Sequence, residues 1–160
     1  MDDYEIAIFA AGCFWGVEDK FRRLDGVIST RVGYTGGHVP DATYKEVCSN
    51  KTGHAEAVEV IFDPKTVSYE NLLEKFWDVH DPTTLNRQGP DIGRQYRSAI
   101  FYLDNDQKEK ALRSKEKLEQ SRKFRHPIVT EITPATEFWE AEEYHQQYNE
   151  KKKQRFSVFL

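Results

Sequence analysis

The chain alternates short apolar segments of β-strand character with longer segments in which apolar residues recur at helical spacing. The predicted strands are residues 4–12, 27–34, 54–64, 97–103 and 128–139. The predicted helices are residues 16–26, 68–82, 104–121 and 140–153. This order contains two split βαβ units, which pack helices on one face of a mixed sheet. We therefore expect an α/β fold, a two-layer sandwich with a ferredoxin-like split βαβ core, formed as one domain by residues 1–160.

Two long polar loops, residues 35–53 and 83–96, interrupt this pattern. Loops of such length in a small domain are commonly functional or disordered. They contain Tyr44, Asp91 and Tyr96, whose hydroxyl and carboxyl groups form hydrogen bonds. Because functional residues concentrate in loops on a rigid scaffold, these three residues are candidates for a site.

Charge and cysteine content restrict the class of function. Charged residues make up 31% of the chain and the formal net charge is -4, so no global positive field attracts nucleic acid or an anionic membrane. A small molecule or a protein is the expected substrate. Cys13 and Cys48 are too few for a disulfide scaffold, which implies a reducing compartment. Asp2 and Asp3 stand where a secretory signal would be positively charged, so we expect a cytoplasmic protein.

Cys13 lies at the predicted junction between the first strand and the first helix, and Phe14 and Trp15 follow it at once. Free N–H groups and the dipole at a helix N-terminus stabilise a thiolate, which predicts a lowered pKa and a nucleophilic Cys13. Consecutive residues at a helix start cannot both face the core, so one ring should remain beside the thiol as a wall for a small apolar group. The alternative is a small buried cysteine beside two packing rings.

Glu56 stands between Ala55 and Ala57 on the third predicted strand. On the core side of that strand its carboxyl group would have a raised pKa and could donate a proton at neutral pH. On the outer side it would be an ordinary solvated carboxylate, as we expect for Glu59. The residue pattern leaves both orientations open.

Metal and cofactor motifs are incomplete in this sequence. His54 and Glu56 form an H-x-E pair like that of zinc deaminases, but the P-C-x-x-C that completes the signature is missing, since no cysteine follows Cys48. The glycine-rich segment 33–41 matches neither the phosphate-binding loop nor the dinucleotide fingerprint. We therefore expect neither a metal nor a bound cofactor.

Two other functions fit parts of the pattern. One is a cysteine hydrolase or acyltransferase that pairs Cys13 with His54 or His80 and needs an orienting third group. The aromatic residues after the thiol would crowd its oxyanion hole. The other is an aromatic cage for a methylated ammonium group, lined by Phe14, Trp15 and Tyr96. This alternative assigns no function to Cys13.

Five ordered motifs resemble peptide methionine sulfoxide reductase type A over nearly the whole chain. They are GCFWG at 12–16, GYTGG at 33–37, YKEVCSNKTGHAEAVEVIFDP at 44–64, FWDVHDPTTLNRQGPDIGRQYRS at 76–98 and FWEAEEYHQQY at 138–148. The resemblance implies a two-layer α/β oxidoreductase that reduces methionine-S-sulfoxide, free or in proteins, and so repairs oxidative damage. We expect it to act as a monomer.

The resemblance also implies roles for the polar candidates. Cys13 attacks the sulfoxide sulfur, and Glu56 donates a proton to the departing oxygen. Tyr44 and Tyr96 donate hydrogen bonds to that oxygen. The products are methionine and a sulfenic acid on Cys13, which is the first step of thiol oxidation.

By the same resemblance, Phe14 and Trp15 hold the methyl group of the substrate, and Asp91 shapes and polarises the site. The placement of the rings relative to the acid would select one sulfoxide epimer. Pro90 stands where this family is expected to have Asn, which stiffens the loop that presents Asp91.

Recycling of the thiol is the step for which the resemblance gives least guidance. Many members of that family carry recycling cysteines in a C-terminal tail, whereas this chain ends QRFSVFL. We therefore expect an external thiol, thioredoxin or glutathione with glutaredoxin, to reduce Cys13. Cys48 is a possible resolving residue, but we favour its alternative, a buried packing residue with a raised pKa.

Overall fold

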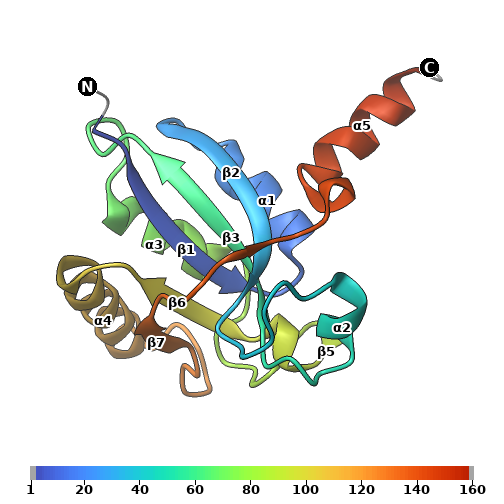
Figure 1. Ribbon diagram of the computed structural model, residues 1–160. Helices are drawn as coiled ribbons and strands as arrows, with labels where there is room; N and C mark the ends of the chain where they lie inside the picture. Colours follow the sequence, from blue (N-terminus) through green and yellow to red (C-terminus); the bar gives the residue numbers. More distant parts are fainter. Residues whose placement is uncertain (1–2, 159–160) are drawn as a thin grey trace.

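The structure is a computed structural model that describes residues 3–158 (Figure 1). Its main sheet has six strands in the spatial order β7-β6-β1-β3-β2-β8. Their bounds are β1 Glu5–Ala11, β2 Val27–Thr35, β3 Ala55–Phe62, β6 Ser98–Tyr102, β7 Glu131–Pro134 and β8 Trp139–Glu140. A separate hairpin is formed by β4 (Arg87–Gln88) and β5 (Asp91–Ile92).

The four central strands form the two predicted split βαβ units. α1 (Phe14–Arg22) connects β1 to β2, and α3 (Tyr69–Asp78) lies between β3 and β6 in the chain. The neighbouring pairs β6 with β1, β1 with β3, and β3 with β2 are all antiparallel. β7 adds a parallel strand beside β6, which makes the sheet mixed. The predicted α/β sandwich with a ferredoxin-like core is therefore confirmed.

The main hydrophobic core lies between the sheet and the helices α1 and α3. Phe9 at the centre of β1 stacks on Phe21 of α1 with the ring centroids 5.2 Å apart, and it contacts Phe76 of α3 at 5.3 Å. All three rings are fully buried. Burial of each such side chain contributes about 1.5–3 kcal/mol. This packing fixes the end of β1, where the chain turns into α1.

The opposite face of the sheet is lined by small side chains and covered by a connecting segment. Ala10, Ala57 and Ala99 lie in this second cluster, against which Ala135 and Phe138 pack. Figure 1 shows the chain after β7 crossing this face of the sheet towards α5. The alanines allow the segment to lie close to the strands.

The sequence prediction is wrong for parts of the C-terminal third. One strand is predicted over residues 128–139, but β7 and β8 lie at opposite edges of the sheet. Pro134 ends β7 at one edge, as expected for a residue without a backbone N–H. The helix expected over residues 140–153 begins only at Tyr148: α5 spans Tyr148–Val158, and a short 3₁₀ turn, η2 (Glu143–His145), precedes it.

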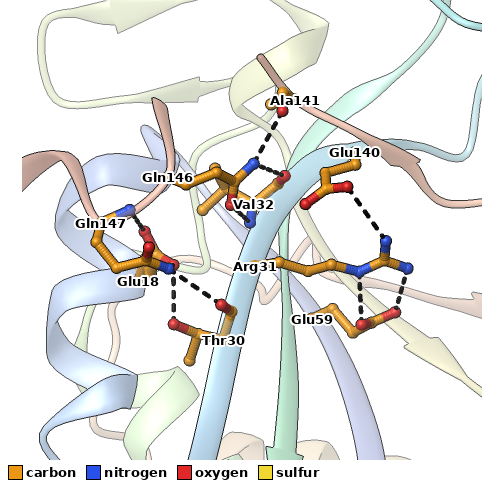
Figure 2. Close-up of polar contacts among 9 residues, drawn as sticks. All are labelled: Glu18, Thr30, Arg31, Val32, Glu59, Glu140, Ala141, Gln146 and Gln147. Carbon is orange, nitrogen blue, oxygen red and sulfur yellow. Dashed lines mark hydrogen bonds and ion pairs between the residues drawn. The ribbon is translucent and has the colours of Figure 1, made fainter. Parts of the chain in front are cut away.

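Residues 139–147, here called the C-terminal strap, are held against α1 and β2 by side-chain amides (Figure 2). Gln146 accepts a hydrogen bond from the Val32 N–H and donates one to the Val32 carbonyl oxygen, each at 2.9 Å. The backbone N–H and the Nε2 of Gln147 both donate to Glu18 of α1, at 2.8 Å. These tertiary hydrogen bonds override the helical propensity of the strap, which explains the late start of α5.

A short helix, α2 (Tyr44–Cys48), lies inside the segment predicted as a loop over residues 35–53. Thr43 and Glu46 form a capping box, in which each side chain bonds the backbone N–H of the other residue. This T-x-x-E pattern is visible in the sequence and signals a helix start. The prediction of a continuous loop is therefore wrong at α2.

The predicted helix over residues 104–121 is confirmed as α4 (Asn105–Gln120). It buries only a narrow face, formed by Gln107 and Ala111, and its other side chains are mostly charged. Between residues 3 and 158, no helix combines the length and the apolar character needed to cross a bilayer.

Candidate active site

Cys13 lies in the turn between β1 and α1, at the N-cap position of the helix. Gly12 enters this turn with φ of +98°, and a Cβ at that position would lie 2.7 Å from Gln88 Cγ. The turn therefore requires glycine before the cysteine. The hairpin that carries Gln88 rests directly against the turn, and Cys13 is partly exposed with a free thiol.

The pKa of Cys13 differs from the sequence prediction. It is raised to about 11, first by burial and then by the carboxyl groups of Glu56 and Asp91. The backbone N–H groups of Trp15 and Gly16 at the helix start lower the pKa, as expected, but desolvation has the larger effect. The predicted thiolate is therefore wrong: Cys13 carries its proton at neutral pH.

Glu56 lies on the side of β3 that faces the helices and is 1% exposed. Its Oε1 accepts a hydrogen bond from the N–H of Phe14, the residue after Cys13, at 3.2 Å. Its Oε2 is buried and has no hydrogen-bond partner within the described residues. Burial raises the pKa of Glu56 to about 8, the Phe14 N–H lowers it, and Asp91 raises it. The inward orientation and the raised pKa are confirmed, so a protonated carboxyl group lies next to the thiol at neutral pH.

The two loop tyrosines meet beside this acid. The Tyr44 hydroxyl lies close enough to Tyr96 to lower the pKa of that residue. Burial and, after it, the charge of Glu56 raise the pKa of both tyrosines, that of Tyr96 to about 12. The Tyr44 ring also packs against His145 with the ring centroids 4.5 Å apart. Both hydroxyls keep their protons at neutral pH and can donate hydrogen bonds to an oxygen atom near Glu56.

Asp91 is presented by the β4–β5 hairpin, where it pairs with Gln88. Its charge raises the pKa of three groups in the site: Cys13, Glu56 and Tyr96. Asp91 therefore lies within electrostatic reach of both the thiol and the acid. The 83–96 loop contributes two candidates, as expected, because its hairpin folds back onto Gly12.

The two aromatic residues after Cys13 have different surroundings. Phe14 is 1% exposed and packs between tyrosine and histidine rings. Trp15 is partly exposed, its Nε1 donates to His145 Nδ1 at 2.9 Å, and its ring stacks on Tyr148 with the centroids 3.9 Å apart. The prediction that only one of the two rings faces the core is confirmed, and the accessible ring is that of Trp15.

The histidines of the alternative Cys–His function are engaged elsewhere. His54 accepts from the Gly37 N–H and contacts the Val39 carbonyl oxygen. His80 bonds the Phe76 carbonyl oxygen and Ser98 Oγ, and burial lowers its pKa to about 4. Neither ring has a nitrogen left for Cys13. Among the described residues, no group of three or more His, Cys, Asp or Glu side chains could hold a metal ion.

Comparison with known proteins places this site in a family. The family model for peptide methionine sulfoxide reductase matches residues 5–159. The chain belongs to the peptide methionine sulfoxide reductase family. It is therefore an oxidoreductase, as the sequence motifs indicate.

Similar reductases match the chain over most of its length. The peptide methionine sulfoxide reductase MsrA of Methanothermobacter thermautotrophicus is 62% identical over 155 residues, which cover 97% of this chain and 92% of the relative. That of Methanosarcina acetivorans is 64% identical over 148 residues, or 92% of this chain and 79% of the relative. The structure of Mxr1 from Saccharomyces cerevisiae in reduced form is 36% identical, with a TM-score of 0.88 over 94% of this chain and 87% of that one.

The second thiol of this methionine sulfoxide reductase also lies close to the site. Cys48 ends α2, one helical turn after Tyr44, and it is exposed, so the expectation of a buried residue is wrong. Its pKa is raised as expected, first by partial desolvation, while the Tyr44 hydroxyl lowers it and Glu56 raises it. Residues four apart share one helix face, and Tyr44 and Cys48 lie close enough to shift each other's pKa.

Two polar residues that hold the site of the reductase together are absent from the candidates predicted by sequence. His145 is fully buried and accepts the hydrogen bond from Trp15. Glu142 accepts hydrogen bonds from Tyr34 and Tyr44. Both lie in the motif FWEAEEYHQQY. The sequence predicts a helix over residues 140–153, and a helix there does not bring either side chain to the site.

Proposed function

We propose that this reductase uses Cys13 as the nucleophile and Glu56 as the acid to reduce methionine-S-sulfoxide, free or in proteins, to methionine. The observation that carries the proposal is the carboxyl group of Glu56. It is buried beside the thiol turn, its pKa is raised to about 8, and its Oε2 has no hydrogen-bond partner within residues 3–158. A sulfoxide oxygen would accept a hydrogen bond from that group.

The reaction balances with the residues of the site. Cys13 attacks the sulfoxide sulfur and gives up its proton, while Glu56 delivers a proton to the sulfoxide oxygen. The attack forms an S–S bond between Cys13 and the substrate. As the oxygen moves to the Cys13 sulfur, this S–S bond and the S–O bond of the substrate both break, and the thiol proton restores Glu56. The substrate is reduced by two electrons to a thioether, and Cys13 is oxidised by two electrons to a sulfenic acid. Tyr44 and Tyr96 donate hydrogen bonds to the developing negative oxygen.

The raised pKa of Cys13 fits this scheme. A neutral thiol reacts slowly with general oxidants, because the thiolate is the nucleophile. Since Glu56 is protonated below pH 8, it does not repel a developing thiolate, and the N–H groups of Trp15 and Gly16 are placed to stabilise it. The Cys13 thiol would then become reactive only when the sulfoxide oxygen accepts the proton of Glu56.

Incubation with methionine sulfoxide and dithiothreitol, followed by chromatography of amine-labelled methionine, tests the activity directly. Methionine should accumulate catalytically. A hydrolase or an ammonium-binding cage would form none, so the same assay separates the three functions that the sequence leaves open.

Trp15→Ala is expected to weaken substrate binding. The Trp15 ring is the accessible aromatic ring of the pair after the thiol, and both Trp15 and the buried Phe14 pack on His145, so we propose that Trp15 contacts the methyl group. Removing this ring should raise KM for methionine-S-sulfoxide about tenfold, the scale for a lost apolar contact in a specificity pocket. Steady-state kinetics on the separated epimers measures the change. The parent enzyme should reduce the S epimer and ignore the R epimer, and equal turnover of the two would contradict the pocket.

The partners follow from the substrate and the thiol. Oxidised proteins and free methionine sulfoxide are the proposed substrates, in a reducing, cytoplasmic setting where the enzyme repairs oxidative damage. A solved structure shows Mxr1 from Saccharomyces cerevisiae in complex with Trx2. This supports thioredoxin as the reductant, and glutathione with glutaredoxin is the alternative.

Treatment with one equivalent of substrate in the absence of reductant is expected to leave a sulfenic acid on Cys13 and a free thiol on Cys48. External reduction predicts this result, because the pKa of Cys48 is raised and its thiol is a weak nucleophile at neutral pH. Mass spectrometry after dimedone labelling measures both sites.

The exposed position of Cys48 makes the opposite outcome informative. A Cys13–Cys48 disulfide in the mass spectrum, with slower thioredoxin-driven turnover for Cys48→Ser, would make Cys48 the resolving residue. Cα atoms roughly 4.4–6.8 Å apart are needed for such a bond.

A further inference from the structure

Glu142 of the C-terminal strap links two segments that carry groups of the site. Its Oε1 accepts a hydrogen bond from the Tyr34 hydroxyl at 2.8 Å, and its Oε2 accepts one from the Tyr44 N–H at 3.1 Å. Tyr34 is fully buried in β2, directly opposite Glu56 in the strand register. A single carboxylate thus joins the first residue of α2 to the strand pair that holds the proposed acid.

α2 needs such an external attachment. A helix of five residues is too short to be stable by itself, because helix nucleation is unfavourable. Its capping box with Thr43 and Glu46 satisfies N–H groups within the same segment, but it does not attach α2 to the sheet. Val47 packs into the core, and Glu142 provides the polar attachment at the first residue of α2. The N–H and hydroxyl donors hold the pKa of Glu142 below its usual range despite partial burial, so the carboxylate is charged at neutral pH. A negative charge is favourable at a helix N-terminus.

The strap keeps its place without Glu142. Gln146 pairs with the backbone of β2 through both ends of its carboxamide, and Gln147 binds the buried Glu18 of α1, as Figure 2 shows. β8 holds the strap before Glu142, and the bonds of Gln146 and Gln147 hold it after Glu142. Loss of the Glu142 carboxylate should therefore loosen Tyr44 at the start of α2, while Val47 stays packed in the core and the strap and the sheet remain in place.

We propose that Glu142 is a positioning residue: it holds the Tyr44 hydroxyl at the distance from Glu56 that the reaction requires. The inference rests on the proposed role of Tyr44 as a hydrogen-bond donor to the sulfoxide oxygen. Glu142 does not touch the substrate. It acts through Tyr44, and its effect disappears when Tyr44 has no hydroxyl to position.

Single-turnover reduction of methionine-S-sulfoxide, measured by rapid quenching, tests this positioning. We expect Glu142→Ala to slow the step about 10- to 100-fold, the range that a misplacement of about 1 Å can cause. Tyr44→Phe sets the upper limit of that loss. In the double variant Glu142→Ala/Tyr44→Phe, the rate should equal that of Tyr44→Phe alone.

The comparison separates positioning from a structural effect. Thermal unfolding of the same variants should show that Glu142→Ala lowers stability equally in the parent and in the Tyr44→Phe background, whereas the rate loss occurs only in the parent background. Glu142→Gln, which retains one acceptor oxygen and the size of the side chain, should be intermediate in rate and serves if the alanine variant folds poorly. Glu140→Ala removes a carboxylate from the same strap that pairs only loosely with Arg31, at 3.9 Å, and should leave the rate unchanged.

Each alternative outcome has a definite meaning. If Tyr44→Phe is slow but Glu142→Ala turns over at the parent rate, the positioning role is overturned while the proposed function stands. Additive losses in the double variant would also overturn it, because Glu142 would then act elsewhere. If Tyr44→Phe reacts at the parent rate, the proposed role of Tyr44 fails, and the inference about Glu142 fails with it.

Discussion

Cys13→Ser is expected to abolish turnover of methionine sulfoxide. The proposed reaction ends with an oxygen atom on the protein sulfur, and a serine oxygen has no oxidation state that corresponds to a sulfenic acid. Loss of a catalytic nucleophile should lower the rate by at least about 10⁴-fold. Methionine formation with dithiothreitol as reductant measures it.

The serine variant should fold, which makes its inactivity interpretable. Cys13 is the N-cap of α1 but forms no side-chain cap hydrogen bond, and serine is a preferred residue at this position. Thermal unfolding should therefore show stability equal to or greater than that of the parent. Cys48→Ser is the matched control for loss of a thiol, and it should retain turnover with dithiothreitol. More than trace reductase activity in Cys13→Ser would refute the assignment of the nucleophile.

Short-range sequence patterns predict those strands and helices whose structure depends on neighbouring residues in the chain. β1 is buried on both faces, so it appears in the sequence as a short continuous apolar run between turn residues. Glu56 is different, because the alternation of β3 fixes only that Glu56 and Glu59 face opposite sides of the sheet. Which side is the core depends on α1 and α3, and the sequence could not decide between the two orientations. The structure buries Glu56 against α1 and pairs Glu59 with Arg31 on the other face.

The pKa of Cys13 could not be predicted from its neighbours in the chain. The helix N-terminus has the expected effect, since the Trp15 and Gly16 N–H groups lower the pKa. Desolvation outweighs it, and the packing around the thiol comes from distant segments: the hairpin with Gln88 lies against Gly12, and β3 brings the carboxyl group of Glu56. Effects that depend on long-range packing have no local sequence signal.

The predicted helix over the strap is wrong for a related reason. EAEEYHQQY has high helical propensity, but its glutamines bond the backbone of β2 and the side chain of Glu18, which are more than 100 residues away in the chain. Propensity is a weak preference that such tertiary bonds override. Glu142 and His145 have no local signal as site residues, because only the tertiary position of the strap beside α1 and α2 brings them to the site.

Glu56→Gln is expected to slow reduction strongly and to stabilise the protein at the same time. Glutamine keeps the shape and the acceptor for the Phe14 N–H, but it has no acidic proton to deliver. A loss of roughly 10²–10⁴-fold in single-turnover rate is the scale for removal of a general acid. The parent rate should also fall above about pH 8, where Glu56 ionises, and the variant should lack this decrease. A variant that matches the parent rate at pH 7 would show that Glu56 is not the acid.

Glu56→Gln should lower the rate but raise the free energy of unfolding, and the size of this stabilisation should depend on pH. Burial raises the pKa of Glu56 from 4.5 to about 8, so the folded protein holds a proton that the unfolded chain releases between these values. The stability contribution of Glu56 is therefore fully present below pH 4.5 and is lost as the pH rises to about 8. Glutamine does not titrate, so the advantage of Glu56→Gln should grow over this range by roughly 3–5 kcal/mol and then level off. Urea unfolding of both proteins at pH 5, 7 and 9 measures the difference. A constant difference across these three pH values would mean that Glu56 is solvated and ionised in the folded protein, and it could not then act as the proton donor.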